Sequence, residues 1–291
     1  MSQLRYLPLK SGKWELSMGL KPLAIAEWID IDEHFTYELS LKEKLSSHHR
    51  RDVFVSLPGS EVSQQETLAL LLEHLSTYFP QHYQLQENQI KDLTTGRVWC
   101  INEFRKAPLE LAGRLVQEDF LILEFSDKGY ILTAASVCFP LRWNLRSKLG
   151  LPLAAIHQPV PGYQEKLQRP VDSFFEHIKP NRLFWRSNWS IVETPELFLP
   201  PEKEKIREVK ITKDNAGENL WLRVERQSLR RLEKSGAVLF TIHSYVYPMY
   251  LIKKFPEIAS SLAKTLQKIP SQMQIYKNIS SIREALLQYL E

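Results

Sequence analysis

The hydrophobic pattern of this chain changes near residue 120 from the period of α-helices to that of β-strands. Three earlier segments have helical spacing or a helix-start signal: 33–47, 63–78 and 108–119. In the second of these, Leu68, Leu71 and Leu75 recur at helical spacing, and Pro80 lies just beyond the expected end. Helices followed by a run of strands are typical of an α+β fold.

Five later segments are short apolar runs of strand length: 120–125, 130–139, 184–192, 220–227 and 237–247. The first two flank the turn sequence Asp127-Lys128-Gly129 and are expected to form a hairpin. Further helices are expected at 171–178, 255–269 and 280–290. We therefore predict an α+β fold with an antiparallel sheet of five strands. It would consist of an N-terminal helical extension (1–107), a core (108–250) and C-terminal helices (251–291).

The composition and the absent motifs exclude several classes of protein. The 38 basic residues exceed the 34 acidic ones by only four, so nucleic acid is not an expected partner. Cys100 and Cys138 are far apart, which argues against a disulfide framework, a structural zinc site or a four-cysteine iron–sulfur cluster. The sequence lacks GxGxxG, GxxxxGK(S/T), HExxH and GxSxG. It therefore shows no Rossmann loop, P-loop or hydrolase elbow.

No segment is expected to cross a membrane. The most apolar stretch, 236–252, is interrupted by Thr241, His243, Ser244 and Pro248 and falls short of the roughly 20 residues of a spanning helix. The N-terminal residues lack the continuous apolar region of a secretory signal peptide. We therefore expect a cytoplasmic protein that does not bind a membrane.

One histidine lies in an unusually rigid segment, Ile156-His157-Gln158-Pro159-Val160-Pro161-Gly162-Tyr163. Each proline fixes its φ angle and the glycine permits a tight turn, so His157 would have little conformational freedom. Its imidazole is a candidate axial ligand for a metal ion or a haem iron. Alternatively, His157 only hydrogen-bonds backbone carbonyls in a tight turn. Another histidine, His243, lies inside an apolar strand, where a core role is the simpler interpretation.

The expected strand 220–227 carries charges on both faces. Alternation places Arg223, Glu225 and Gln227 on one face and Arg226 on the other. A charge that points into a half-buried sheet requires a partner. Either an arginine–glutamate network braces the sheet, or Arg223 or Arg226 binds a carboxylate, such as a haem propionate, through its guanidinium group.

The segment Arg186-Ser187-Asn188-Trp189 places a cation, an amide and a large aromatic side chain on one strand. Trp189 is more simply a core residue, while Asn188 could orient a small polar substrate. The segment by itself is a weak signal for a binding site.

Together these segments resemble the haem-dependent oxidative N-demethylase family. The blocks that carry the resemblance, in chain order, are 108–109, 113–119, 139–143, 148–150, 156–163, 169–172, 186–189, 223–232 and 235–237. The resemblance covers roughly residues 28–250, and IHQPVPGY and RVERQSLRRL are its most specific blocks. It implies a PAS-like fold, with a five-stranded antiparallel sheet flanked by helices, that binds haem b.

The resemblance also implies roles for individual residues. His157 would be the proximal ligand of the haem iron. The family commonly has arginine at the position of His243, so this chain has a second imidazole there, which is the alternative ligand. Arg223 and Arg226 would bind the haem propionates. Glu225 and Asn188 would act on the substrate, the carboxylate either holding its ammonium group or bracing an arginine. The residues beside the cofactor would be Pro161, Tyr163, Arg186 and Trp189.

The implied activity is an oxidative N-demethylation of a small secondary or tertiary amine with O2, which releases formaldehyde. Electrons would come from NADPH through the flavin and iron–sulfur groups of a separate reductase or ferredoxin-type partner. This agrees with the absence of a Rossmann loop and a four-cysteine set from the sequence. An alternative is a PAS-like haem-binding sensor or carrier without turnover, and a third is a scaffold without a cofactor.

Overall fold

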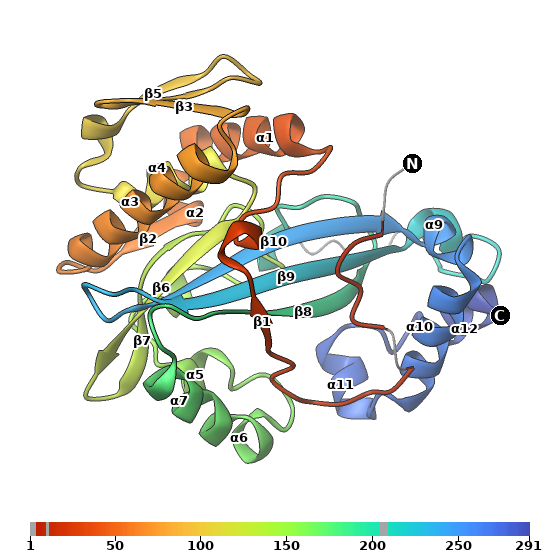
Figure 1. The fold of residues 1–291 in the computed structure, drawn as a ribbon. Helices are drawn as coiled ribbons and strands as arrows, with labels where there is room; N and C mark the ends of the chain where they lie inside the picture. The colour runs from red at the N-terminus through yellow and green to blue at the C-terminus, as the bar shows by residue number, and fades with distance from the viewer. Residues whose placement is uncertain (1–3, 10–11, 204–208) are drawn as a thin grey trace.

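A computed structural model describes residues 4–9, 12–203 and 209–291, and its centre is an antiparallel sheet of seven strands (Figure 1). The strands cross the sheet in the order β1-β8-β9-β10-β6-β7-β2. Their bounds are Lys21–Leu23 (β1), Phe54–Ser56 (β2), Asp119–Ser126 (β6), Gly129–Ser136 (β7), Leu183–Val192 (β8), Trp221–Arg231 (β9) and Val238–Pro248 (β10). A smaller sheet consists of Tyr83–Gln86 (β3), Gln89–Asp92 (β4) and Val98–Cys100 (β5).

The five predicted strands are present and lie next to one another, but the sheet is not the five-stranded PAS-like sheet that we expected. β1 pairs with β8 and β2 pairs with β7, which adds one strand at each edge. Each added strand has only three residues, too few for alternation to be recognised in a sequence. The smaller sheet was missed as well, because its strands have only three or four residues. The predicted hairpin is confirmed as β6 and β7.

Helices surround the sheet. Their bounds are Phe35–His48 (α1), Arg50–Val53 (α2), Glu61–Tyr78 (α3), Pro108–Leu115 (α4), Leu153–Ile156 (α5), Tyr163–Lys166 (α6), Gln168–His177 (α7), Ala216–Asn219 (α8), Met249–Lys253 (α9), Pro256–Lys268 (α10), Ser271–Tyr276 (α11) and Arg283–Leu290 (α12). Five predicted helices correspond to α1, α3, α7, α10 and α12. The prediction 108–119 was wrong in its last four residues, because the backbone is already extended at Val116 and β6 begins at Asp119.

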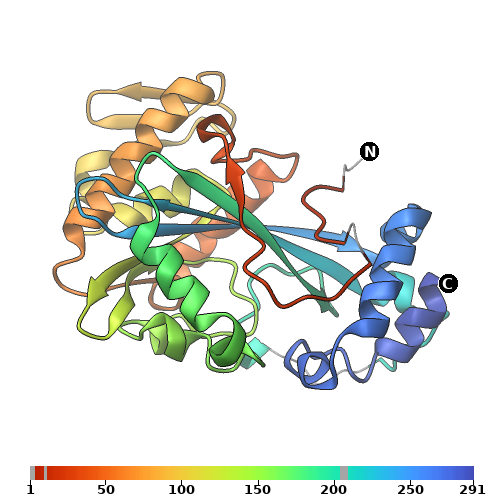
Figure 2. The same ribbon diagram turned by 60° about the horizontal axis from the view of Figure 1, so that its bottom comes forward.

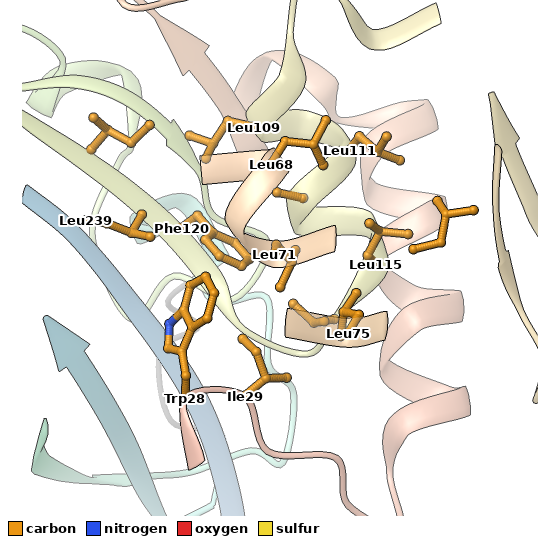
Figure 3. Packing of buried hydrophobic residues seen from close by; sticks show 14 of the residues in the cluster. Trp28, Ile29, Leu68, Leu71, Leu75, Leu109, Leu111, Leu115, Phe120 and Leu239 are labelled. Carbon is orange, nitrogen blue, oxygen red and sulfur yellow. The ribbon is translucent and has the colours of Figure 1, made fainter. Parts of the chain in front are cut away.

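The sheet is a middle layer that is covered on both faces. On one face, Leu71 of α3 is buried against Phe120 of β6 and Leu239 of β10 (Figure 3). Val238 precedes Leu239 and therefore points to the opposite face, where it packs with Phe175 of α7. Figures 1 and 2 show α5, α6 and α7 on this second side of the sheet. Residues far apart in the sequence thus enclose the strands.

The C-terminal helices cover the far ends of β9 and β10 (Figure 1). Leu222 and Tyr247 of these strands belong to the same buried cluster as Leu262 and Leu266 of α10 and Leu286 of α12. This packing confirms the two closing helices that the sequence predicted. It also brings α11 and the residues after it towards the end of β8, which the sequence did not predict.

Gly113 of α4 lies where this helix comes close to the sheet. A Cβ atom at position 113 would be 2.1 Å from Oγ of Ser136 on β7. Gly113→Ala should therefore lower the free energy of unfolding by about 1–3 kcal/mol through overpacking, measured by urea denaturation. In a Ser136→Ala background the loss should be smaller, because the nearest atom is removed. An equal loss in both backgrounds would contradict this account of the contact.

Candidate functional site

His157 is held at the end of α5 with one ring nitrogen engaged and the other available. Its Nδ1 lies 2.9 Å from the carbonyl oxygen of Leu153. Because a carbonyl can only accept a hydrogen bond, Nδ1 carries the proton and Nε2 keeps its lone pair. Burial lowers the pKa of His157, and the positive charge of Arg186 lowers it further, against the hydrogen bond to Leu153. A neutral imidazole with one nitrogen fixed by a carbonyl is the form that coordinates a metal.

The rest of the proline-rich loop orients this ring. The rings of His157 and Tyr163 stack with centroids 4.7 Å apart and an angle of 9° between their planes. Gly162, with φ of +77°, provides the left-handed turn that begins α6 and places Tyr163 there. Pro161, directly before Gly162, is half-buried. The hydroxyl of Tyr163 is buried and has no hydrogen-bond partner among the described residues, so a polar atom of a bound molecule could still be accommodated.

The sheet face that is turned towards this loop carries the predicted polar residues of β8 and β9. Arg186 is paired with Gln227, and Asn188 with Glu225. Residues directly opposite each other in an antiparallel pair point to the same side, so these four side chains share a face. Leu229, two residues beyond Gln227, lies on this face and packs with α5 and α7. The face is therefore the one that His157 and its loop cover.

Arg186 and Glu225 give this face its charge. The Nε atom of Arg186 is buried and lacks a hydrogen-bond partner among the described residues. Burial lowers the pKa of Arg186, and the negative charge of Glu225 opposes that effect. Glu225 accepts hydrogen bonds from Nε2 of Gln227 at 2.9 Å and from Nδ2 of Asn188 at 3.5 Å. The charge of Arg186 thus acts on His157 on one side and meets that of Glu225 on the other, and Glu225 is bonded to Asn188.

Lys277, directly after α11, is a residue of this site that the sequence reasoning missed. Its side chain is buried, and its Nζ donates to the carbonyl oxygen of Trp189 at 2.6 Å and to Oδ1 of Asn188 at 3.5 Å. Burial lowers the pKa of Lys277 to about 8, although Glu225 favours the charged form. No signal in the sequence could have identified it, because lysines near helix C-termini are common and mostly exposed.

Arg223 and Arg226 are occupied by the protein itself. Arg223 is fully buried and donates to the carbonyl oxygens of Leu197 at 3.0 Å and Phe139 at 2.5 Å. Arg226 lies on the opposite face of β9 and donates to the carbonyl oxygen of Trp28 at 3.1 Å. The predicted alternation is therefore present. Both arginines donate to backbone carbonyls, and Arg223 also donates to Oγ of Ser244, whereas neither forms an ion pair with Glu225.

Trp189 and His243 also lie on the face away from His157. The ring of Trp189 belongs to the cluster that includes Val224 and lies 6.5 Å from the ring of Trp14. His243 is fully buried and is paired across the sheet with Arg226. Both positions follow from alternation, since each is one residue away from a position on the His157 face. Both side chains are buried on the other side of the sheet.

His243 is held between two carboxylates. Its Nε2 is 3.7 Å from Asp32 and its Nδ1 is 3.3 Å from Glu118, while its ring stacks on Tyr245 with centroids 4.3 Å apart. Burial alone would lower the pKa of His243, but the charge of Glu118 and the contacts with both carboxylates outweigh burial and raise it to about 10. A protonated imidazole has no lone pair to give to a metal. His243, the alternative iron ligand that the sequence suggested, is therefore held by Asp32 and Glu118.

The donors around His157 suit a haem better than a bare metal ion. In the described part of the chain, no group of three His, Cys, Asp or Glu side chains is arranged to hold a metal. A metal at His157 would take most of its ligands from another molecule, as the iron of a haem does from its porphyrin. Two cavities of about 250 and 190 Å³ are lined by residues around Tyr245 and around Arg230, and neither lining includes His157.

The fold and this site define an α+β protein with a neutral, oriented histidine beside one face of its sheet. The family model described as haem-dependent oxidative N-demethylase, alpha subunit-like, matches residues 19–287. The chain belongs to this family, which confirms the resemblance found in the sequence. Haem dependence and oxidative N-demethylation are thereby supported for the family. Among the described residues, none of the helices is long and apolar enough to cross a membrane.

Replacement of His243 should destabilise the fold without emptying the His157 site. Removing one partner of a buried ion pair typically costs about 3–5 kcal/mol, so His243→Gln should lower the free energy of unfolding by that amount at pH 7. Circular dichroism and urea denaturation measure this loss. A loss of less than about 1 kcal/mol, the value of an exposed pair, would show that His243 is not charged in the folded protein.

The same pair makes the stability depend on pH. The pKa of His243 is raised from 6.5 to about 10 in the folded protein, so the folded state binds this proton more tightly than the unfolded state. The stabilisation is complete below about pH 6.5 and is lost as the pH rises towards 10. Between pH 7 and 10, the difference in unfolding free energy between the wild type and His243→Gln should therefore shrink. A constant difference would contradict the raised pKa.

Proposed function

We propose that this chain is the haem-binding oxygenase component of an oxidative N-demethylase that acts on a small secondary or tertiary amine. The observation that carries the proposal is His157, a neutral and oriented imidazole whose Nε2 has a free lone pair. The positive charge of Arg186 on the facing strand β8 acts on this imidazole. The family match over residues 19–287 supports the same chemistry.

In this proposal the residues around His157 hold the cofactor. His157 binds the iron of haem b, and Pro161 and Tyr163 keep its ring in place. Arg186 is the cation nearest to the cofactor, in preference to Arg223 and Arg226, whose terminal nitrogens already donate to backbone carbonyls. When bound, the haem supplies the oxidising chemistry that removes the N-methyl group with O2.

Glu225 and Asn188 would position the substrate. An amine with the basicity of an alkylamine enters as its ammonium form, which the carboxylate of Glu225 attracts strongly in a site with little water. Gln227 and Asn188 hold this carboxylate through hydrogen bonds, so it does not need to reorganise when the substrate binds. The sheet and α5–α7 exclude bulk water from the reacting group.

The electrons would come from another protein. The sequence has neither a dinucleotide-binding loop nor four clustered cysteines, so we propose NADPH oxidation by a separate partner with flavin and iron–sulfur groups. We further propose that residues 108–250 form the haem-binding core, that the N-terminal region 1–107 packs on it and that 251–291 are C-terminal helices. Lys277 is the contribution of the C-terminal part to the site.

The first test is the absorption spectrum of protein purified from haem-supplemented cells. A Soret band that shifts when dimethylamine is added, with formaldehyde released in the presence of a reductant, is the expected result. A Soret band that does not respond to amines would favour the alternative, a haem-binding sensor or carrier. A colourless protein that also fails to bind added haemin would reject both.

A matched pair of substitutions tests the iron ligand. His157→Ala should lower the haem content by about tenfold or more, since the iron loses its protein ligand. His177 is the control, because its Nδ1 also bonds the carbonyl oxygen four residues earlier, at 2.7 Å, but it is exposed on α7. His177→Ala and His243→Gln should keep their haem, measured as the ratio of Soret to protein absorbance. Loss of haem from His243→Gln alone, with the fold intact, would overturn the assignment.

A further inference from the structure

The charges on the His157 face do not balance. Two cations, Arg186 and Lys277, lie near one carboxylate, Glu225, whose charge acts on both of them. Arg223 does not enter this count, because its guanidinium group is bound to Leu197, Phe139 and Ser244. Two positive charges against one negative charge leave a surplus of one positive charge in a largely buried site.

Neither cation has a carboxylate partner. In the described part of the chain, no carboxylate oxygen lies within 4.0 Å of a side-chain nitrogen of Arg186 or Lys277. Lys277 is bound only by neutral oxygens, and the buried Nε of Arg186 has no partner. A buried charge without a counter-charge is strongly unfavourable. On the other face of the sheet, by contrast, His243 has two carboxylates beside it.

Asn188 keeps the unlike charges apart. Its Oδ1 accepts from Nζ of Lys277 and its Nδ2 donates to Glu225, each at 3.5 Å. The amide therefore stands between the ammonium and the carboxylate, where a direct ion pair would otherwise form. Lys277 is also held from behind by the carbonyl oxygen of Trp189 and lies 5.1 Å from the centre of its ring. Both charged groups are thus available to a bound molecule.

We propose that Arg186 and Lys277 together bind a carboxylate group next to Glu225. This inference rests on the proposed function, because it adds a second recognition element to the same site. The carboxylate can come from a haem propionate or from the substrate itself. In the second case the substrate class is an N-methylated amino acid, whose ammonium group binds Glu225 while its carboxylate binds the two cations. Such a zwitterion carries its two opposite charges on separate groups, as the amide of Asn188 separates the ammonium of Lys277 from the carboxylate of Glu225.

The test compares ligands that differ only in the carboxylate. N-Methylglycine and N-methylglycinamide have nearly the same size and both carry a methylammonium group, but only the first is anionic at one end. Isothermal titration calorimetry measures their binding, and that of haemin, to the wild type and to Arg186→Gln and Lys277→Met. Arg182→Gln and Lys91→Met are matched controls, since both side chains are exposed and outside the site.

A substrate carboxylate predicts that N-methylglycine binds more tightly than its amide. Each site variant should then lose about tenfold or more of that affinity, because one charged partner is removed, and Lys277→Met should do so with haemin binding unchanged. A haem propionate predicts instead a loss of haemin affinity of about tenfold or more in both variants, with no preference between the two amines. Unchanged binding of every ligand in both variants, with the fold intact, would overturn the carboxylate site.

These outcomes are separate from failure of the proposed function. Formaldehyde release from dimethylamine by the wild type tests the activity and does not require Arg186 or Lys277 to bind an anion. Calorimetry of N-methylglycine does not require turnover. A protein that demethylates dimethylamine but ignores the carboxylate would reject the further inference alone.

Discussion

The layered structure depends on a buried ion pair between Lys42 of α1 and Asp119 at the start of β6. Their Nζ and Oδ1 atoms are 3.1 Å apart, and each side chain is only 1% exposed. The remaining bonding capacity is used as well. Asp119 accepts from the backbone N–H groups of Cys138 and Phe139 at 2.9 Å, and Lys42 donates to the carbonyl oxygen of Glu118. A buried pair is tolerated only when it is satisfied in this way, so this contact determines where α1 and the turn after β7 meet the sheet.

The two faces of the sheet differ in whether their buried cations have carboxylate partners. On the face of α3 and α4, His243 lies between the carboxylates of Asp32 and Glu118. On the face of α5–α7, neither Arg186 nor Lys277 has a carboxylate within 4.0 Å among the described residues, and Lys277 is bound by neutral oxygens. Compensation stabilises a fold, and uncompensated charge at a neutral histidine is typical of a site that completes itself with a ligand.

Much of the architecture could be predicted because its signals are local. The strands β6 to β10 and the helices α3 and α10 have apolar residues at the correct period, and Asp127 with Gly129 marks the hairpin turn. The edge strands β1 and β2 could not be predicted, because three residues carry no period and only their pairing with β8 and β7 makes them strands. The end of α4 was misjudged because Asp119 is held in β6 by Lys42, a residue distant in the sequence.

For the site, the rigid loop was enough to single out His157, since prolines and a glycine restrict the backbone wherever they occur. Alternation along β9 was enough to separate Arg223 and Glu225 from Arg226. What each arginine contacts was decided only by the tertiary structure, because the carbonyls of Phe139, Leu197 and Trp28 come from distant segments. The same holds for Lys277, which becomes part of the site only when α11 packs near the end of β8. Local sequence determines the backbone conformation and the sheet face on which a side chain lies. The partners of a charged side chain, by contrast, depend on contacts between residues far apart in the chain, and these contacts decide which charges lack a partner.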